Sequence, residues 1–330
     1  MTADRRRRRL VIAAAAAAAA GPLAALPARA QAWPSRPIRI VCPLPPGGLT
    51  DLYSRAIGEH LQTSLGQTVV VENRPGAGGL IGSEMVAKAA PDGYTFLVVI
   101  QTSIVQAQVL YKKLPYNPDT DFTWISALGA GHLPFGVPAS LPAKNFREFV
   151  EYAKSNRTSI GTYAPGSYPH MVSAQLNKLY GTKIEAVHYK GEAPMLIDLA
   201  GGQIQGAIGS VQGMLPHAQK GNIRLLAVPT AVRSPKLPDV PTFIEQGFTA
   251  PVFSIAGWIG LFGPAKLPRE IVDRVSKLVI EAGESARLRQ IYETFGIAER
   301  PTTPEEFLRI YRTEGPQWIA MTKELGITLD

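Results

Sequence analysis

The feature that most constrains this chain is an apolar strand that ends in a Pro/Gly turn and leads directly into a helix. It occurs twice, at residues 41–51 and, about 120 residues later, at residues 160–170. The first N–H groups of a helix have no acceptor within the helix, and the helix dipole adds about half a positive charge there. Each turn is therefore a candidate anion site. Two such turns predict a protein that holds a small carboxylate between two lobes.

Residues 1–30 have the three parts of a secretory signal peptide. The arginines from Arg5 to Arg9 precede an alanine-rich apolar run, and Ala28, Arg29 and Ala30 fit the small-x-small pattern of a cleavage site. The apolar run is short and weak for a membrane span, so an uncleaved anchor is the less favoured alternative. We expect a periplasmic mature protein, with general or twin-arginine export left open.

The net charge of +8 comes largely from this segment. It contains six of the 34 Lys and Arg residues and one of the 26 Asp and Glu residues, which leaves 28 against 25, a net charge of +3. This charge is too small to predict a nucleic-acid partner, and no basic run remains after cleavage.

The mature chain is long enough for more than one hydrophobic core. About 300 residues follow the signal peptide, which predicts two lobes. The single cysteine, Cys42, lies in the first apolar strand, where it cannot form an internal disulfide and is expected to be buried.

Strands and helices alternate along the chain, which predicts an α/β fold. In the first part we expect strands at 38–41, 69–71 and 94–100, and helices at 50–65 and 80–90. In the middle part we expect helices at 146–154, 168–180 and 194–200, and strands at 159–163, 184–187, 207–210 and 225–228. The tail reads as helices at 269–282, 286–295 and 304–325, the last kinked at Pro316.

We place the crossings between the lobes near residues 135–137 and in the apolar strand 254–262, where Trp258 is expected in the core. This organisation predicts residues 31–134 plus 254–330 as the first lobe and 135–253 as the second.

Six short motifs follow one another along the mature chain. They are Pro45-Pro46-Gly47-Gly48 with Asp51, VENRPGAGG at 71–79, AAPDGYT at 89–95, KLPY at 113–116, YKG at 189–191 and LPDVPT at 237–242. In this order they resemble the Bug/TctC family, the extracytoplasmic solute-binding proteins of tripartite tricarboxylate transporters. The resemblance covers essentially the whole mature chain.

The resemblance implies a two-lobed periplasmic binding protein of type II, the Venus-flytrap kind, with its ligand cleft between the lobes. A small carboxylate would lie between the Pro-Gly-Gly loop of one lobe and the Gly/Ser loop of the other, held by backbone N–H groups and ordered water. The closed protein, a monomer, would pass it to membrane transporter subunits without chemistry on it and without a cofactor.

The first lobe supplies two groups of candidate ligand-binding residues. Small glycines let an anion approach the N–H groups of Gly48, Leu49 and Thr50, and the Thr50 hydroxyl could instead cap the helix. Asp51 would repel an anion, so we expect it to close the lobes or hold water. The candidates here are Pro46, Gly47, Gly48, Leu49, Thr50 and Asp51, with Thr102 and Ser103 at the carboxyl end of a strand.

The second lobe supplies the opposite wall. Ser167 is the expected hydroxyl donor, and His170 is as much a structural histidine as a ligand contact. Lys190, beside Tyr189, is expected at the surface. The candidates are Tyr163, Ala164, Gly166, Ser167, His170, Tyr189, Gly209 and Ser210.

Two departures from the family pattern concern the ligand. Many relatives carry an aspartate where Gly209 stands, and a pocket aspartate suits a ligand amine. Its absence here argues against an amino-acid ligand. Tyr163 and Tyr168 replace smaller residues, which favours a flat apolar ligand body, such as an aromatic carboxylate or a dicarboxylate.

No residue pattern indicates a metal, a cofactor or a catalytic site. The five histidines lack metal-ligand spacing, and the glycine-rich turn at 76–82 has Ile81 where a dinucleotide fingerprint needs glycine. Two alternatives remain. One is an exported serine hydrolase using Ser167 and His170, although no nucleophile elbow surrounds Ser167. The other is a periplasmic sensor that binds the same ligand and signals to a membrane kinase.

Overall fold

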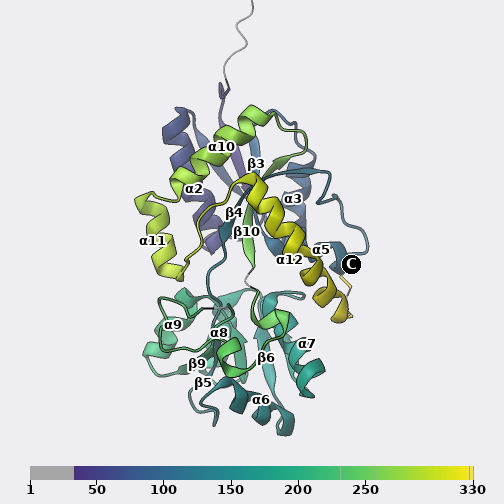
Figure 1. Ribbon diagram of the computed structural model, residues 1–330, viewed down its shortest axis with the longest axis vertical. Coiled ribbons are helices and arrows are strands. Elements are labelled where there is room, and N and C mark those ends of the chain that lie inside the picture. The colour runs from purple at the N-terminus through teal and green to yellow at the C-terminus, as the bar shows by residue number, and fades with distance from the viewer. Residues whose placement is uncertain (1–32, 231, 256, 327, 330) are drawn as a thin grey trace, which may run out of the picture. The chain divides into compact units, whose positions relative to one another are not determined.

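The computed structural model describes residues 33–330 except 231, 256, 327 and 330, so the expected signal peptide lies outside the described residues. From Arg36 onward the chain forms one compact unit containing two five-stranded sheets with helices packed around them (Figure 1). None of the helices in this part of the chain has the length and apolar character of a membrane span. The predicted α/β class is confirmed.

The first sheet has the strand order β2-β1-β3-β10-β4. β1 pairs in parallel with β2 and β3, and β10 runs antiparallel between β3 and β4. β1 and β3 are buried almost throughout, as expected for strands covered on both faces. The strands are β1 (Ile38–Cys42), β2 (Val69–Asn73), β3 (Thr95–Ile100), β4 (Phe122–Gly129) and β10 (Trp258–Pro264).

The helices around this sheet come from both ends of the chain (Figure 1). They are α2 (Leu49–Leu65), α3 (Leu80–Ala87), α4 (Gln101–Ile104), α5 (Ala107–Leu110), α10 (Arg269–Ala282), α11 (Ala286–Phe295) and α12 (Pro304–Glu324), with a short 3-10 turn, η1 (Ala77–Gly79).

The second sheet repeats this topology with the order β7-β6-β8-β5-β9. β6 pairs in parallel with β7 and β8, and β5 runs antiparallel between β8 and β9. Its elements are β5 (Phe135–Pro138), α6 (Phe146–Ser155), β6 (Ser159–Thr162), α7 (Tyr168–Tyr180), β7 (Glu185–His188), α8 (Glu192–Ala200), β8 (Gly206–Ile208), α9 (Val211–Gln219), β9 (Ile223–Ala227), η2 (Ile244–Gln246) and η3 (Pro251–Phe253).

In each sheet the antiparallel strand is the one that arrives from the segment of the other sheet, β5 directly after β4 and β10 after η3. The internal repeat therefore extends beyond the two turns to whole sheets. The strands divide as the predicted lobes do, and the lobe boundaries themselves stay predictions.

Several element boundaries differ from the sequence prediction. Thr102 and Ser103, expected at the end of a strand, lie in the helix α4 that follows β3, and the helix expected to reach residue 90 ends at Ala87. The second crossing strand begins at Trp258, not at residue 254, and β4 was not predicted. α12 runs through Pro316 as one helix. Trp258 and Cys42 are buried, as expected.

Candidate functional site

The predicted site residues share one topological position. Each lies just after the carboxyl end of a parallel strand or in the first turn of the helix that follows it. In the first sheet they follow β1 and β3, and in the second they follow β6, β7 and β8. Ligands of α/β proteins bind at this edge of the sheet because the loops and helix ends gather there.

The loop between β1 and α2 is open to solvent. Pro46, Gly47 and Gly48 are exposed, and Leu49 is half-buried. Gly48 is the N-cap of the 17-residue helix α2. Within the described chain, no acceptor bonds the N–H groups of Gly48, Leu49 and Thr50. The loop thus presents three backbone donors at the positive end of a helix.

Asp51 holds this loop in shape. Its buried carboxylate accepts hydrogen bonds from the Gly47 N–H at 3.0 Å, the Asn73 amide at 2.9 Å and the Arg55 guanidinium at 3.0 Å. Burial opposes ionisation, but these donors outweigh it and lower the pKa of Asp51. Its partners lie in the loop itself, in α2 and at the end of β2, all on the side of the first sheet, which favours a loop-fixing role over the lobe-closing or water-holding role expected from the sequence.

Thr50 does not cap α2 with its side chain, contrary to one of the two roles expected for it. Gly48 takes the N-cap position, and Thr50 lies buried in the first turn.

The residues after β3 face the interior more than expected. Ser103 is buried and donates to the Gly78 carbonyl at 2.7 Å, beneath the glycine-rich turn. Thr102 is half-buried. Gln101, which the prediction passed over, accepts from the Trp258 N–H at 3.3 Å, and its buried Nε2 has no partner among the described residues. Gln101 is therefore a candidate donor next to the crossing strand.

The loop between β6 and α7 is bonded to itself. The Ser167 hydroxyl donates to the Ala164 carbonyl at 2.6 Å, and the Gly166 N–H donates to His170 Nδ1 at 3.0 Å. This bond requires His170 Nδ1 to be unprotonated. Burial, with the nearby His188, lowers the pKa of His170 and favours that neutral form. The N–H groups of Tyr168 and His170 remain without an acceptor in the described chain.

The two tyrosines of this loop differ. Tyr168, taken with Tyr163 to favour a flat apolar ligand body, is buried, donates to the Val252 carbonyl at 2.8 Å and packs against Trp318. Tyr163 is half-buried and lies near enough to Glu192 for that charge to add to the effect of burial in raising its pKa.

A carboxylate that sequence reasoning missed lies beside Gly209. Glu192, the first residue of α8, accepts from the Ser210 N–H at 2.5 Å and from the Ser210 hydroxyl at 3.0 Å. A Cβ on Gly209 would lie 2.5 Å from Glu192 Oε1. Glu192 thus brings a carboxylate to the place beside Gly209 from another segment of the chain. This weighs against the argument that the missing aspartate disfavours an amino-acid ligand, and the ligand preference stays a prediction.

Tyr189 also has a partner of its own. Its hydroxyl donates to Asp198 at 2.7 Å, and burial together with this bond raises the pKa of Tyr189 to about 12. Lys190 is exposed, as expected.

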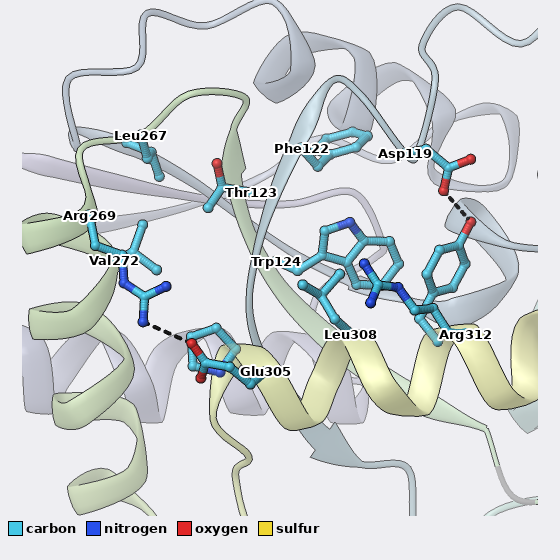
Figure 2. A pocket seen from close by; sticks show the side chains of 12 residues that line it. Asp119, Phe122, Thr123, Trp124, Leu267, Arg269, Val272, Glu305, Leu308 and Arg312 are labelled. Carbon is cyan, nitrogen blue, oxygen red and sulfur yellow. Dashed lines mark hydrogen bonds and ion pairs between the residues drawn. The ribbon is translucent and has the colours of Figure 1, made fainter.

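A separate pocket of about 490 Å³ is lined by residues of β4, α10 and α12. Figure 2 shows the side chains that line it. Phe122, which lines it, is opposite Pro264 in the pairing of β4 with β10. This end of β10 lies near the amino end of β3, away from the predicted site residues. Trp124 stacks on Tyr311 there, and Arg269 pairs with Glu305 at 2.8 Å. None of the predicted site residues lines it.

The described residues hold no metal-binding group of three or more His, Cys, Asp or Glu side chains. In this part of the chain no hydrogen bond joins Ser167 to His170; the Ser167 hydroxyl donates to Ala164, and His170 accepts from Gly166.

Comparison with known proteins places this chain in a family. The chain is 31% identical to the protein BugT of Bordetella pertussis, with 92% of this chain and 94% of BugT covered. It is 33% identical to a protein encoded between tcbD and tcbE in Pseudomonas sp. strain P51, over 88% and 86% of the two chains.

Solved structures agree. The periplasmic binding protein BugD superposes with a TM-score of 0.77 at 30% identity, over 90% of this chain and 100% of BugD. A protein of R. palustris solved with adipate superposes with a TM-score of 0.79 at 32% identity, over 90% of this chain and 100% of that protein. MatC of Rhodopseudomonas palustris with bound malate superposes with a TM-score of 0.75 at 28% identity, over 88% of this chain and 100% of MatC. Residues 53–327 match the tripartite tricarboxylate transporter family receptor, TctC, and the chain belongs to this family of solute-binding proteins.

Proposed function

We propose that the mature chain works in the periplasm, where it captures a small organic carboxylate by closing its two lobes and delivers it to the membrane subunits of a tripartite transporter. The observation that carries this proposal is the set of open N–H groups of Gly48, Leu49 and Thr50 at the exposed amino end of α2. A carboxylate accepts such donors and is favoured by the helix dipole. The relatives solved with adipate and malate support the ligand class.

The second lobe contributes weaker contacts in this proposal. The free N–H groups of Tyr168 and His170 face the same edge of the second sheet as Tyr163 and Ser210. Ser167 serves the ligand only as an acceptor, or as a donor after releasing the Ala164 carbonyl. In this proposal the lobes close about residues 130–134, between β4 and β5, and about residues 254, 255 and 257, before β10. Closure follows ligand binding only if the ligand prefers the closed state.

The protein acts in this proposal as an exported monomer without enzymatic activity. The internal bonds of Ser167 and His170 weigh against the hydrolase alternative. A sensor that signals to a membrane kinase would use the same ligand site, and co-purification from membranes separates it from the transporter role by the partner recovered.

The test is thermal unfolding of the purified protein with a panel of mono- and dicarboxylates and with their neutral amides as controls. A carboxylate at about 100 times its dissociation constant should raise the free energy of unfolding by about 2.7 kcal/mol. The amides should have no effect. If no carboxylate stabilises the protein, the proposal fails. Turnover of esters that is lost in Ser167→Ala would favour the hydrolase instead.

A further inference from the structure

The Glu192 carboxylate lies at the carboxyl end of the parallel strands β6, β7 and β8, where the predicted site residues of the second sheet gather. β7 and β8 flank β6, and Glu192 reaches from the loop after β7 across to Ser210, which follows β8. Tyr163, whose pKa responds to the Glu192 charge, directly follows β6. Glu192 thus lies over the end of the central parallel strand.

Two glycines and the N-cap of α9 lie directly beside the Glu192 carboxylate. Glu192 Oε1 lies where a Cβ of Gly209 or Gly213 would approach it to 2.5 or 2.6 Å. Neither glycine has positive φ, so the crowding at these positions comes from side chains and not from the backbone conformation. Glu192 is the nearest at both, and Leu196 adds to it at Gly213, where its Cδ1 would lie 2.8 Å from a Cβ. Ser210, the N-cap of α9, donates to Glu192 with both its N–H and its hydroxyl. Glu192 therefore occupies the amino end of α9, the place at which a ligand carboxylate would otherwise be favoured.

The Glu192 carboxyl has no cationic partner among the described residues; burial raises its pKa, and the two bonds from Ser210 act against that shift and favour the charged form. No salt bridge in the described chain includes Glu192, and the neighbouring Lys190 side chain is exposed. Its two oxygens accept from neutral donors only. A like charge placed against it is repelled, whereas a hydroxyl or an ammonium group finds an acceptor.

We propose that Glu192 is a specificity-determining residue: it fills the α9 helix end and selects against ligands that carry a second carboxylate on the second-lobe side. The inference rests on the proposed function, in which the first carboxylate binds to Gly48, Leu49 and Thr50. The favoured ligands are monocarboxylates whose far end is neutral or carries a hydrogen-bond donor.

The test compares matched pairs of mono- and dicarboxylates of four to eight carbons by calorimetric titration, with hexanoate, 6-hydroxyhexanoate and adipate as the central set. In the wild-type protein the two monocarboxylates should bind more tightly than adipate. Glu192→Gln keeps the side-chain length and removes the charge, and should improve adipate binding about tenfold relative to hexanoate, as expected for removal of a like charge a few ångströms away. Glu192→Ser opens the helix end and should give at least the same gain.

Glu185→Gln is the matched control, because it removes one exposed charge from the start of β7, at the other edge of the same sheet. It should leave the adipate-to-hexanoate ratio unchanged. If both Glu192 variants also leave that ratio unchanged while lowering the melting temperature, Glu192 only caps α9 and the inference is wrong. If the protein binds monocarboxylates but adipate binds as tightly in the wild type, the inference fails and the proposed function stands. If no pair binds, both fail.

Discussion

The two strand–turn–helix loops have the same local design and opposite surroundings. In the loop after β1, Pro46, Gly47 and Gly48 are exposed, and three helix-end donors are free. In the loop after β6, Gly166 and Ser167 are buried and their polar groups are bonded within the loop. The first loop exposes its donors to solvent, whereas the second is largely packed and leaves only the N–H groups of Tyr168 and His170 without an acceptor in the described chain.

Tertiary contacts make this difference. A Cβ on Gly166 would lie 2.5 Å from Leu110 at the end of α5, whereas one on Gly48 would meet nothing within 4 Å. Tyr168 is further fixed by Val252 and Trp318. A Pro/Gly turn before a helix therefore indicates where an anion could bind, but the packing around the turn decides whether the donors are available.

The largest expected effect is on the open loop. Gly48 has an extended backbone that any residue adopts, so Gly48→Val should fold normally. Its branched side chain would stand over the N–H groups and should weaken carboxylate binding about a hundredfold, or about 2.8 kcal/mol. Gly48→Ala should have a smaller effect. Calorimetric titration together with thermal unfolding measures both quantities.

The same change in the packed loop should give the reverse result. Gly166 has φ of 71° and lies against Leu110, so Gly166→Ala should lower the free energy of unfolding by about 2 kcal/mol. If Gly48→Val binds carboxylate normally, or if Gly166→Ala is as stable as the wild type, the contrast between the loops is wrong.

A smaller effect is expected when the support of the open loop is removed. Asp51→Asn should lower the free energy of unfolding by about 1.5 kcal/mol at pH 7, because the carboxylate bonds Gly47, Arg55 and Asn73. The lowered pKa of Asp51 means that its contribution is present above about pH 4 and is lost as the pH falls through the folded-state value.

Chemical denaturation at several pH values measures this effect. The wild type and Asp51→Asn should converge in acid, and Asp239→Asn, which removes an exposed acid, should cost less than about 0.5 kcal/mol. A constant gap between the wild type and Asp51→Asn down to pH 3 would contradict the assignment.

Turn and helix-end residues predict many of the helices and strands from the sequence alone. The predicted helix at 168–180 has the same first and last residues as α7. Pro169 fits its first turn, and Gly181 ends it in the left-handed conformation. The family motifs gave the fold, and the edge at which the site residues gather follows from strand direction. β4 was missed because several prolines lie in the segments around it and hide its short apolar run.

The rest depends on contacts that no local pattern records. Glu192 and Gly209 are brought together by the pairing of β7 and β8 with β6, and nothing in the sequence between them indicates it. Tyr168 is in the core because Trp318 and Val252 come from distant segments. These contacts decide the character of the second lobe's wall.

The smallest expected effect concerns His170, which bonds the packed loop. Its lowered pKa means that the unfolded chain takes up the proton first as the pH falls below about 6.5, so its contribution to stability is present above that pH and is lost in acid. Protonation would also end the bond from the Gly166 N–H. His170→Ala should cost about 1 kcal/mol at pH 7.5, because a buried N–H loses its acceptor. His170→Asn offers an oxygen near the place of Nδ1 and should recover most of that loss.

Denaturation of the three proteins between pH 4.5 and 8 measures the effect. Both variants should show less acid-induced loss of stability than the wild type. An equal pH dependence in all three would mean that His170 does not hold this loop through its neutral form.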